Sequence, residues 1–176
     1  NYTWDELNNR FDELLNLYSN IFSERLVIGQ SVEGRDIWAF KISDNPNIDE
    51  DEPEVLFTSL IHAREPLSMM NLFYFVQKLA EGYNSDEELT YLVNNREMWF
   101  IPVVNPDGYV FNEQIEPFGG GMHRKNRKDT NCGNGTMRGI DLNRNFAFGW
   151  GANNTGSSSD PCSDIYRGES AFSEPE

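Results

Sequence analysis

A buried strand followed at once by His62-Ala-Arg-Glu65 is the feature that most constrains this chain. Residues 54–61 (EVLFTSLI) are rich in β-branched and aromatic side chains, which is typical of a strand inside a sheet. Pro66 suits the first turn of a helix, and an apolar stretch follows over residues 67–81. The pattern therefore predicts a strand and then a helix, with His62 and Glu65 at the carboxyl end of the strand, where α/β sheets place their sites.

The spacing of His62 and Glu65 allows both side chains to bind one metal ion. An imidazole and a carboxylate three residues apart can both reach Zn²⁺, which takes nitrogen and oxygen ligands at about 2.0–2.2 Å. The alternative is a solvent-exposed Glu65 beside a capping His62, because the spacing H-x-x-E is common on its own. The rest of the sequence has to decide between the two interpretations.

The other sequence patterns predict a single α/β domain. Thr3-Trp-Asp-Glu6 is a capping box, and the helix that follows has one apolar face. Two strands of a hairpin, a short helix and a second buried strand are expected at residues 25–30, 35–42, 86–94 and 97–104. A strand, two helices and a strand in succession indicate a partly parallel sheet covered on both faces.

Loops are expected in two places. Asn105-Pro-Asp-Gly-Tyr109 follows the second buried strand, and its Pro and Gly predict a sharp, rigid turn without direct chemistry. Residues 112–163 are dominated by Gly, Asn and Ser, which predicts long ordered loops.

Composition narrows the classes of function. The 176 residues fit one domain, and their net charge of -15 argues against a nucleic-acid-binding protein. No apolar stretch approaches the length of about 18 residues that a membrane-spanning helix needs. We expect a monomer that binds neither nucleic acid nor membranes.

Several short motifs occur in a characteristic order. They are His62–Glu65, Asn105–Tyr109, His123–Arg127, Asp141–Asn145, Tyr166–Gly168 and Phe172–Glu176. In this order, the set resembles the zinc carboxypeptidases of the carboxypeptidase A/B type, over nearly the whole chain. The resemblance implies a mixed, twisted sheet flanked by helices, and a zinc-dependent exopeptidase that hydrolyses the C-terminal peptide bond of peptides and proteins. It also implies that residues 1–176 are the N-terminal portion of one catalytic domain, with the fold incomplete at its C-terminal side.

The resemblance assigns His62 and Glu65 to the zinc site and gives Arg124 a catalytic role. Arg124 would polarise the scissile carbonyl and stabilise the oxyanion, since a guanidinium is effective in a water-poor site. A solvated charged face is the alternative for the basic run His123–Lys128. His123 occupies a position that is commonly aromatic in the family, and we expect it to pack or cap rather than bind metal beside Arg124.

The resemblance also assigns three residues to substrate binding. Asn143 and Arg144 would hold the free carboxylate at the C-terminus of the substrate, since Arg binds a carboxylate through two hydrogen bonds and Asn adds a neutral donor. A loop salt bridge between Arg144 and Asp141 is the alternative. Arg64 matches a position that contacts the substrate further upstream, and a surface ion pair is its alternative.

Part of the expected site lies outside this stretch. A catalytic zinc has three protein ligands and a water, and the resemblance places the third ligand, a His, beyond residue 176. The general-base Glu, the mobile Tyr and the residue that selects the substrate side chain would follow it. Residues 1–176 alone are therefore expected to be inactive and to expose open sheet edges.

The chain has two cysteines, Cys132 and Cys162, in polar, loop-like sequence. Free thiols would be typical of a cytosolic protein. The resemblance instead implies a Cys132–Cys162 disulfide, which would close a loop of about 30 residues and contribute roughly 3–4 kcal/mol. A disulfide would place the protein in an oxidising compartment, either extracellular or periplasmic.

Two other functions share parts of these motifs. N-acyl amino-acid deacylases of the desuccinylase and aspartoacylase kind also use H-x-x-E and an Asn-Arg pair. A non-catalytic module that binds peptide C-termini would keep Asn143 and Arg144 without the zinc chemistry. The sequence downstream of residue 176 distinguishes the enzymes from the binding module.

Overall fold

The computed structural model describes residues 2–176, which form two compact units. The first unit comprises the chain up to Ile28, Trp38–Ser59 and Leu67–Val103, and the second comprises Gly29–Ile37, Leu60–Pro66 and Val104–Glu176. All the candidate site residues and both cysteines belong to the second unit. None of the helices in the described part of the chain is long and apolar enough to cross a membrane.

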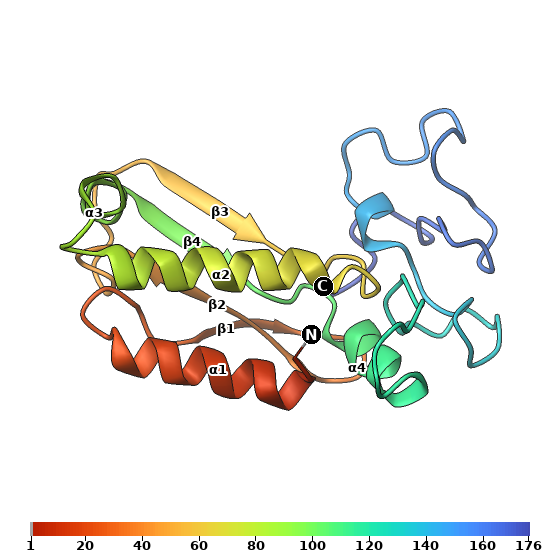
Figure 1. Ribbon diagram of the computed structural model, residues 1–176. Coiled ribbons are helices and arrows are strands. Elements are labelled where there is room, and N and C mark those ends of the chain that lie inside the picture. The colour runs from red at the N-terminus through yellow and green to blue at the C-terminus, as the bar shows by residue number, and fades with distance from the viewer. Residues whose placement is uncertain (1) are drawn as a thin grey trace. The chain divides into compact units, whose positions relative to one another are not determined.

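A four-stranded mixed sheet confirms the predicted fold class. Its strands are β1 (Leu26–Gln30), β2 (Asp36–Ile42), β3 (Glu54–Thr58) and β4 (Glu97–Ile101), in the order β1-β2-β4-β3 (Figure 1). β2 pairs antiparallel with β4, whereas β3 pairs parallel with β4. Between β3 and β4 the chain forms α2 (Pro66–Gly82) and α3 (Glu87–Asn94), the crossover that a parallel pair requires.

One face of the sheet is covered by α1 (Trp4–Leu17) and α2. Phe100 stacks between Phe40 and Phe57 on the neighbouring strands, with ring centroids 5.2 and 5.0 Å away. Phe11 of α1 lies 5.7 Å from Phe40, and Phe75 of α2 lies 5.3 Å from Phe57. Because all three strand rings contact helix residues on this side, the helices and the sheet form one aromatic core.

The opposite face is less covered than predicted. Leu56, which precedes Phe57 of the aromatic core and therefore faces the other side of the sheet, is 61% exposed. Its register partner Trp99 is partly exposed, while Lys41 beside Trp99 is buried and paired with Glu97. In the described part of the chain this face is therefore covered only in part, since Leu56 is exposed whereas Ala39 and Lys41 of β2 are buried.

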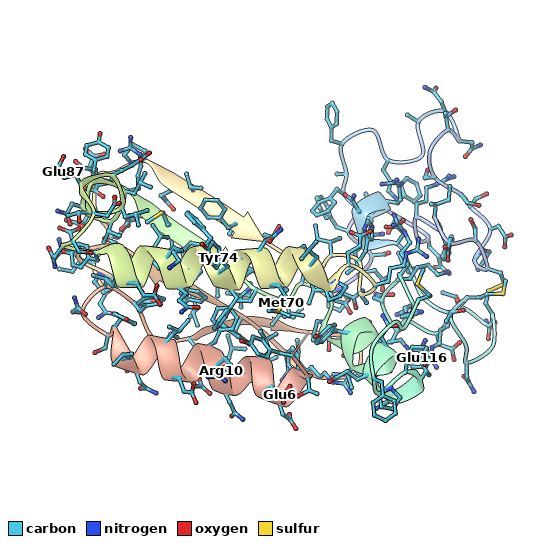
Figure 2. All side chains as sticks on the ribbon, viewed as in Figure 1. Glu6, Arg10, Met70, Tyr74, Glu87 and Glu116 are labelled. Carbon is cyan, nitrogen blue, oxygen red and sulfur yellow. A yellow bond between two sulfur atoms is a disulfide. The ribbon has the colours of Figure 1, made fainter. Side chains whose placement is uncertain are left out.

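The capping box at the start of α1 is confirmed. The backbone N–H of Glu6 donates to Thr3 Oγ1 at 3.2 Å, and the N–H of Thr3 donates to Glu6 Oε2 at 2.9 Å. Leu7 and Phe11 are buried on one side of the helix, whereas Glu6 and Arg10 point away from it into solvent (Figure 2). The helix is therefore amphipathic, as its sequence predicts.

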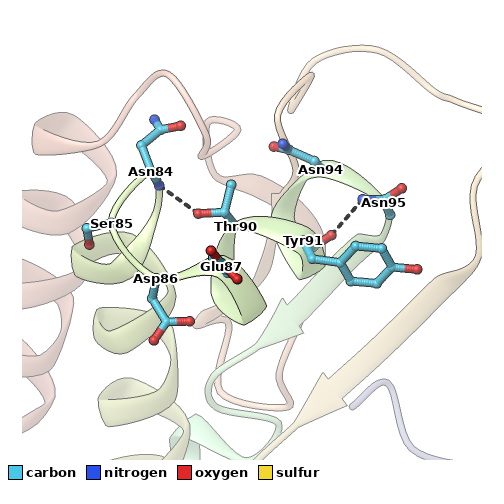
Figure 3. Close-up of a pocket in the computed structure, with 8 residues that line it drawn as sticks. All are labelled: Asn84, Ser85, Asp86, Glu87, Thr90, Tyr91, Asn94 and Asn95. Carbon is cyan, nitrogen blue, oxygen red and sulfur yellow. Dashed lines mark hydrogen bonds between the residues drawn. The ribbon is translucent and has the colours of Figure 1, made fainter.

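A shallow hollow of about 450 Å³ lies at the connection between α2 and α3 (Figure 3). Its polar groups largely bond to each other. Asp86 caps α3 by accepting from Glu88 N and Leu89 N, and Asn84 N donates to Thr90 Oγ1 at 2.9 Å. None of the candidate site residues lines this hollow.

Both strands next to the candidate site segments are shorter than predicted. β3 ends at Thr58 and β4 at Ile101, and the expected turn at Asn105–Tyr109 is instead the start of α4 (Pro106–Ile115). Asn105 caps this helix, because its side-chain oxygen accepts from Gly108 N at 3.0 Å, and Pro106 occupies the first turn. An Asn followed by Pro can begin either a turn or a helix, and in this protein it begins a helix.

The second unit consists mainly of ordered loops, as predicted, and two cross-links hold them. A disulfide joins Cys132 to Cys162, which confirms the expected pairing. Lys125 is fully buried, and its Nζ donates to Met137 O at 2.6 Å and to Ser163 O at 2.8 Å. The ammonium group and the disulfide thus connect the same two loops.

We expect the disulfide to stabilise the full-length protein by roughly 3–4 kcal/mol, because it restricts the unfolded chain. Replacing both Cys132 and Cys162 by Ser should lower the urea midpoint of unfolding accordingly. A thiol reductant should destabilise the wild-type protein and leave the double variant unchanged. If both cysteines of the native protein were alkylated without a reductant, the pairing would be wrong.

Candidate metal and substrate site

His62 lies between two carboxylates. Its Nδ1 is 3.1 Å from Glu65 Oε2, and its Nε2 is 3.1 Å from Asp141 Oδ1. The segment between β3 and α2 turns tightly, with Glu65 N donating to His62 O at 3.0 Å, so both side chains lie on the same side. The imidazole is nearly buried, while the Glu65 side chain is about half exposed, at 53%. His62 is therefore placed between two acids and does not cap the helix.

Asp141 is the residue that joins the site together. Its carboxylate is fully buried and accepts from His62 through Oδ1, and from Arg124 Nε and Nη2 through Oδ2, at 3.1 and 2.9 Å. Burial by itself raises the pKa of Asp141, but the hydrogen bonds from His62 and Arg124 outweigh burial and lower it. The carboxylate thus stays ionised and orients the imidazole, as carboxylates commonly do for metal-binding histidines.

Arg124 lies beside the same carboxylates. Besides its two hydrogen bonds to Asp141, its Nη1 is 3.7 Å from Glu65 Oε1. The guanidinium is only 11% exposed, so its charge acts in a poorly hydrated environment. The structure therefore brings Arg124 together with His62 and Glu65, which lie in a separate motif of the sequence.

Asn143 and Arg144 follow Asp141 in a short 3₁₀ helix, Leu142–Arg144. Asp141 caps this helix, because its Oδ1 also accepts from Asn143 N at 3.1 Å. Arg144 donates to Gly156 O at 2.7 Å and to Asn143 O at 2.9 Å. Both residues line a hollow of about 320 Å³. The alternative of an Arg144–Asp141 salt bridge is wrong for the described residues, since Asp141 pairs with Arg124 and His62.

Arg64 forms an ion pair away from His62 and Glu65. Its Nη1 lies 3.2 Å from Asp164 Oδ2, and both side chains are partly exposed. This is the surface ion pair that the sequence left open, and a pair of this kind contributes little to stability. A role in substrate binding stays a prediction.

The basic run around Arg124 is not a solvated face. His123, Lys125 and Arg127 are all buried. His123 lies edge-on to Phe111 with ring centroids 5.0 Å apart, and its ring nitrogens are 3.2 Å from Thr136 O and 3.1 Å from Asn126 O. These contacts agree with the expectation that His123 packs and caps.

Zinc binding by His62 and Glu65 stays a prediction, and the chemistry of their donor atoms is compatible with it. His62 Nδ1 and the Glu65 carboxylate converge, and nitrogen and oxygen donors of this kind fit zinc. Residues 2–176 contain no group of three His, Cys, Asp or Glu side chains arranged to hold a metal. Sequence patterns alone indicate no role for Asp141 beyond a possible salt bridge with Arg144, whereas the structure places it at the centre of the site. The one indication in the sequence is that Asp141 lies in the same short motif as Asn143 and Arg144.

His123 makes the stability of the protein depend on pH. Burial, and then the positive charge of Arg127, lower the pKa of His123 to about 4. The unfolded chain binds this proton near pH 6.5 and the folded protein only near pH 4, so stability should fall by roughly 3 kcal/mol as the pH decreases between these values. In urea unfolding of the full-length protein, His123→Phe should remove this part of the pH dependence. The same slope in both proteins would contradict the assignment.

The chain matches the zinc carboxypeptidase family over residues 7–176. It is 43% identical over 124 residues to a zinc carboxypeptidase of Saccharothrix mutabilis subsp. capreolus, which covers 70% of this chain and 27% of that protein. It is 40% identical over 148 residues to carboxypeptidase B of Helicoverpa zea, which covers 84% of this chain and 32% of that protein.

The fold agrees with a solved member of this group. The crystal structure of carboxypeptidase A from Helicoverpa armigera superposes with a TM-score of 0.81 at 36% identity, covering 99% of this chain and 40% of that one. The chain thus spans about a third of the length of the curated relatives, 27% and 32% in the two cases above. With the family match extending from residue 7 to residue 176, this protein belongs to the zinc carboxypeptidase family.

Proposed function

We propose that the full-length protein is a zinc-dependent carboxypeptidase that removes the C-terminal residue of peptides and proteins. The observation that carries the proposal is the placement of His62 between Glu65 and Asp141, with Arg124 bound to the same aspartate. In a member of the zinc carboxypeptidase family, this arrangement is suited to hold a metal and to stabilise negative charge next to it.

His62 and Glu65 would hold the zinc. Because Asp141 faces Nε2 of His62, the proton of the neutral imidazole belongs on Nε2, and the lone pair of Nδ1 is directed toward Glu65. Bound zinc would lower the pKa of a water molecule and polarise the carbonyl group of the substrate. The third ligand, a His, would lie beyond residue 176, as would the general-base Glu and the mobile Tyr.

Arg124 would stabilise the oxyanion of the tetrahedral intermediate. Its Nε and Nη2 are bound to Asp141, so the guanidinium is held in place before substrate binds. A fixed cation in a poorly hydrated site needs little reorganisation when charge develops on the substrate oxygen. Asp141 thereby orients both the metal ligand and the oxyanion-stabilising residue.

Asn143 and Arg144 would bind the terminal carboxylate of the substrate, with Arg64 further along the peptide. Arg144 is held by the carbonyl oxygens of Gly156 and Asn143 and by no carboxylate among the described residues, so its positive charge is not neutralised by an ion pair. A free carboxylate at the hollow would supply that partner.

We further propose that residues 1–176 are the N-terminal portion of one catalytic domain, which the family match and the partial coverage of the relatives support. The disulfide supports an oxidising compartment, extracellular or periplasmic. The net charge of -15 argues against nucleic acid and anionic membranes as partners. We expect the protein to act as a monomer.

The full-length protein should release single residues from the C-terminus of peptides with a free carboxylate, and C-terminally amidated peptides should be poor substrates. Removal of zinc with a chelator should abolish the activity, and added zinc should restore it. Mass spectrometry of the products is the measurement. Hydrolysis of N-acyl amino acids in preference to peptides would indicate a deacylase. Binding of peptides without cleavage would indicate a non-catalytic module.

Arg144→Ala should raise KM and lower kcat/KM for free-acid peptides. A charged contact of this kind is worth roughly 2–5 kcal/mol when its partner is left buried and unpaired. Arg144→Lys should recover only part of the loss, because Lys lacks the fork that binds a carboxylate through two hydrogen bonds. Arg10→Ala, on the exposed face of α1, serves as the control for general loss of positive charge. Normal cleavage by Arg144→Ala would place the carboxylate site elsewhere.

A further inference from the structure

Asn105 is a fully buried residue whose side-chain amide donates two hydrogen bonds and accepts one. Its Nδ2 donates to Lys125 O at 3.0 Å and to Ile61 O at 3.3 Å, and its Oδ1 accepts from Gly108 N at 3.0 Å. The last of these bonds caps α4 (Figure 1), which accounts for the oxygen. The two hydrogen bonds donated by Nδ2 go to separate segments of the chain and are not needed to cap α4.

Each of these carbonyl groups belongs to a residue next to a candidate site residue. Ile61 precedes His62, and Lys125 follows Arg124. The same two segments are joined directly through a backbone hydrogen bond from Ala63 N to Arg124 O at 3.1 Å. One amide group therefore holds together the peptides that carry the proposed zinc ligand and the proposed oxyanion-stabilising residue.

The backbone around this contact is tightly constrained. Leu60 has a φ of 51°, a conformation that residues with a side chain rarely adopt, and its carbonyl accepts from Asn105 N at 3.0 Å. A Cβ added to Gly108 would lie 2.7 Å from both Ala63 Cβ and Lys125 O. The start of α4 is thus packed against both segments so closely that only Gly fits at position 108.

We propose that Asn105 is a positioning residue: it sets the distance between His62 and Arg124 by binding the backbone on either side of them. This inference rests on the proposed carboxypeptidase function. Asn105 would contact neither metal nor substrate. It acts through the two segments, whose side chains then meet at Asp141.

Asn105→Asp is the sharpest test, because Asp keeps the helix-capping oxygen but replaces the amide donor with a second oxygen. In the full-length protein, zinc affinity measured by competition with a colorimetric chelator should fall about 10–100-fold. For a free-acid peptide, kcat should fall by a similar factor while KM changes less than about threefold, because the loss concerns alignment rather than substrate binding.

Asn112→Asp is the matched control. Asn112 is a buried Asn on the same helix, and its amide binds only the backbone of His123, through N and O at 2.8 and 2.9 Å. This variant should keep zinc affinity within about twofold, since it does not contact the His62 segment. Equal loss of zinc affinity in both variants, or unchanged zinc affinity and kcat in Asn105→Asp, would overturn the proposal.

If Asn105→Asp does not fold, Asn105→Ser provides the same comparison, because Ser also keeps a capping oxygen and lacks the amide. The zinc measurement does not depend on peptidase activity. A full-length protein without carboxypeptidase activity would overturn the proposed function, whereas weaker zinc binding by Asn105→Ser alone would still support the positioning of His62 by residue 105.

Discussion

The buried carboxylate of Asp141 is the interaction on which the candidate site depends. An ionised carboxylate inside a protein is costly unless it is paired and hydrogen-bonded, and here His62 and Arg124 supply those bonds. The same residue caps the 3₁₀ helix that carries Asn143 and Arg144. A single side chain therefore links the proposed zinc ligand, the proposed oxyanion-stabilising residue and the proposed carboxylate site. Removing it would leave Arg124 buried without its strongest partner.

The order of the second unit comes from side chains more than from helices and strands. Buried backbone groups must form hydrogen bonds, and outside regular secondary structure the chain has to supply other partners. Asn145 shows how this is done: its Nδ2 donates to Arg167 O, Ser170 O and Ser173 Oγ, and its Oδ1 accepts from Glu174 N. Asn126 and Lys125 act in the same way. Asn126 and Asn145 thus serve the structure of these loops.

Much of the fold and part of the site could be predicted from sequence because the signals are local. The capping box at Thr3, the helix that begins at Pro66 and the pairing of Cys132 with Cys162 all follow from short motifs or from the family resemblance. The role of Asp141 could not be predicted in the same way, since it lies 79 residues from His62 in sequence and meets it only in the folded chain. The local pattern predicts a turn at Asn105, because Asn-Pro is compatible with both a turn and a helix cap. The bonds of Asn105 to Ile61 and Lys125 connect distant segments and cannot be inferred from that pattern.

The two cross-links in the second unit differ in chemistry although they connect the same loops. The disulfide between Cys132 and Cys162 responds to the redox state of the surroundings, whereas the bonds from the ammonium group of Lys125 to Met137 O and Ser163 O do not. Reduction of the disulfide would therefore increase the number of conformations that the unfolded chain can adopt, while the bonds from Lys125 keep the folded loops connected. We expect reduction to increase the rate at which a protease cleaves this region through local opening, and to change the folded arrangement of the residues around Arg124 much less.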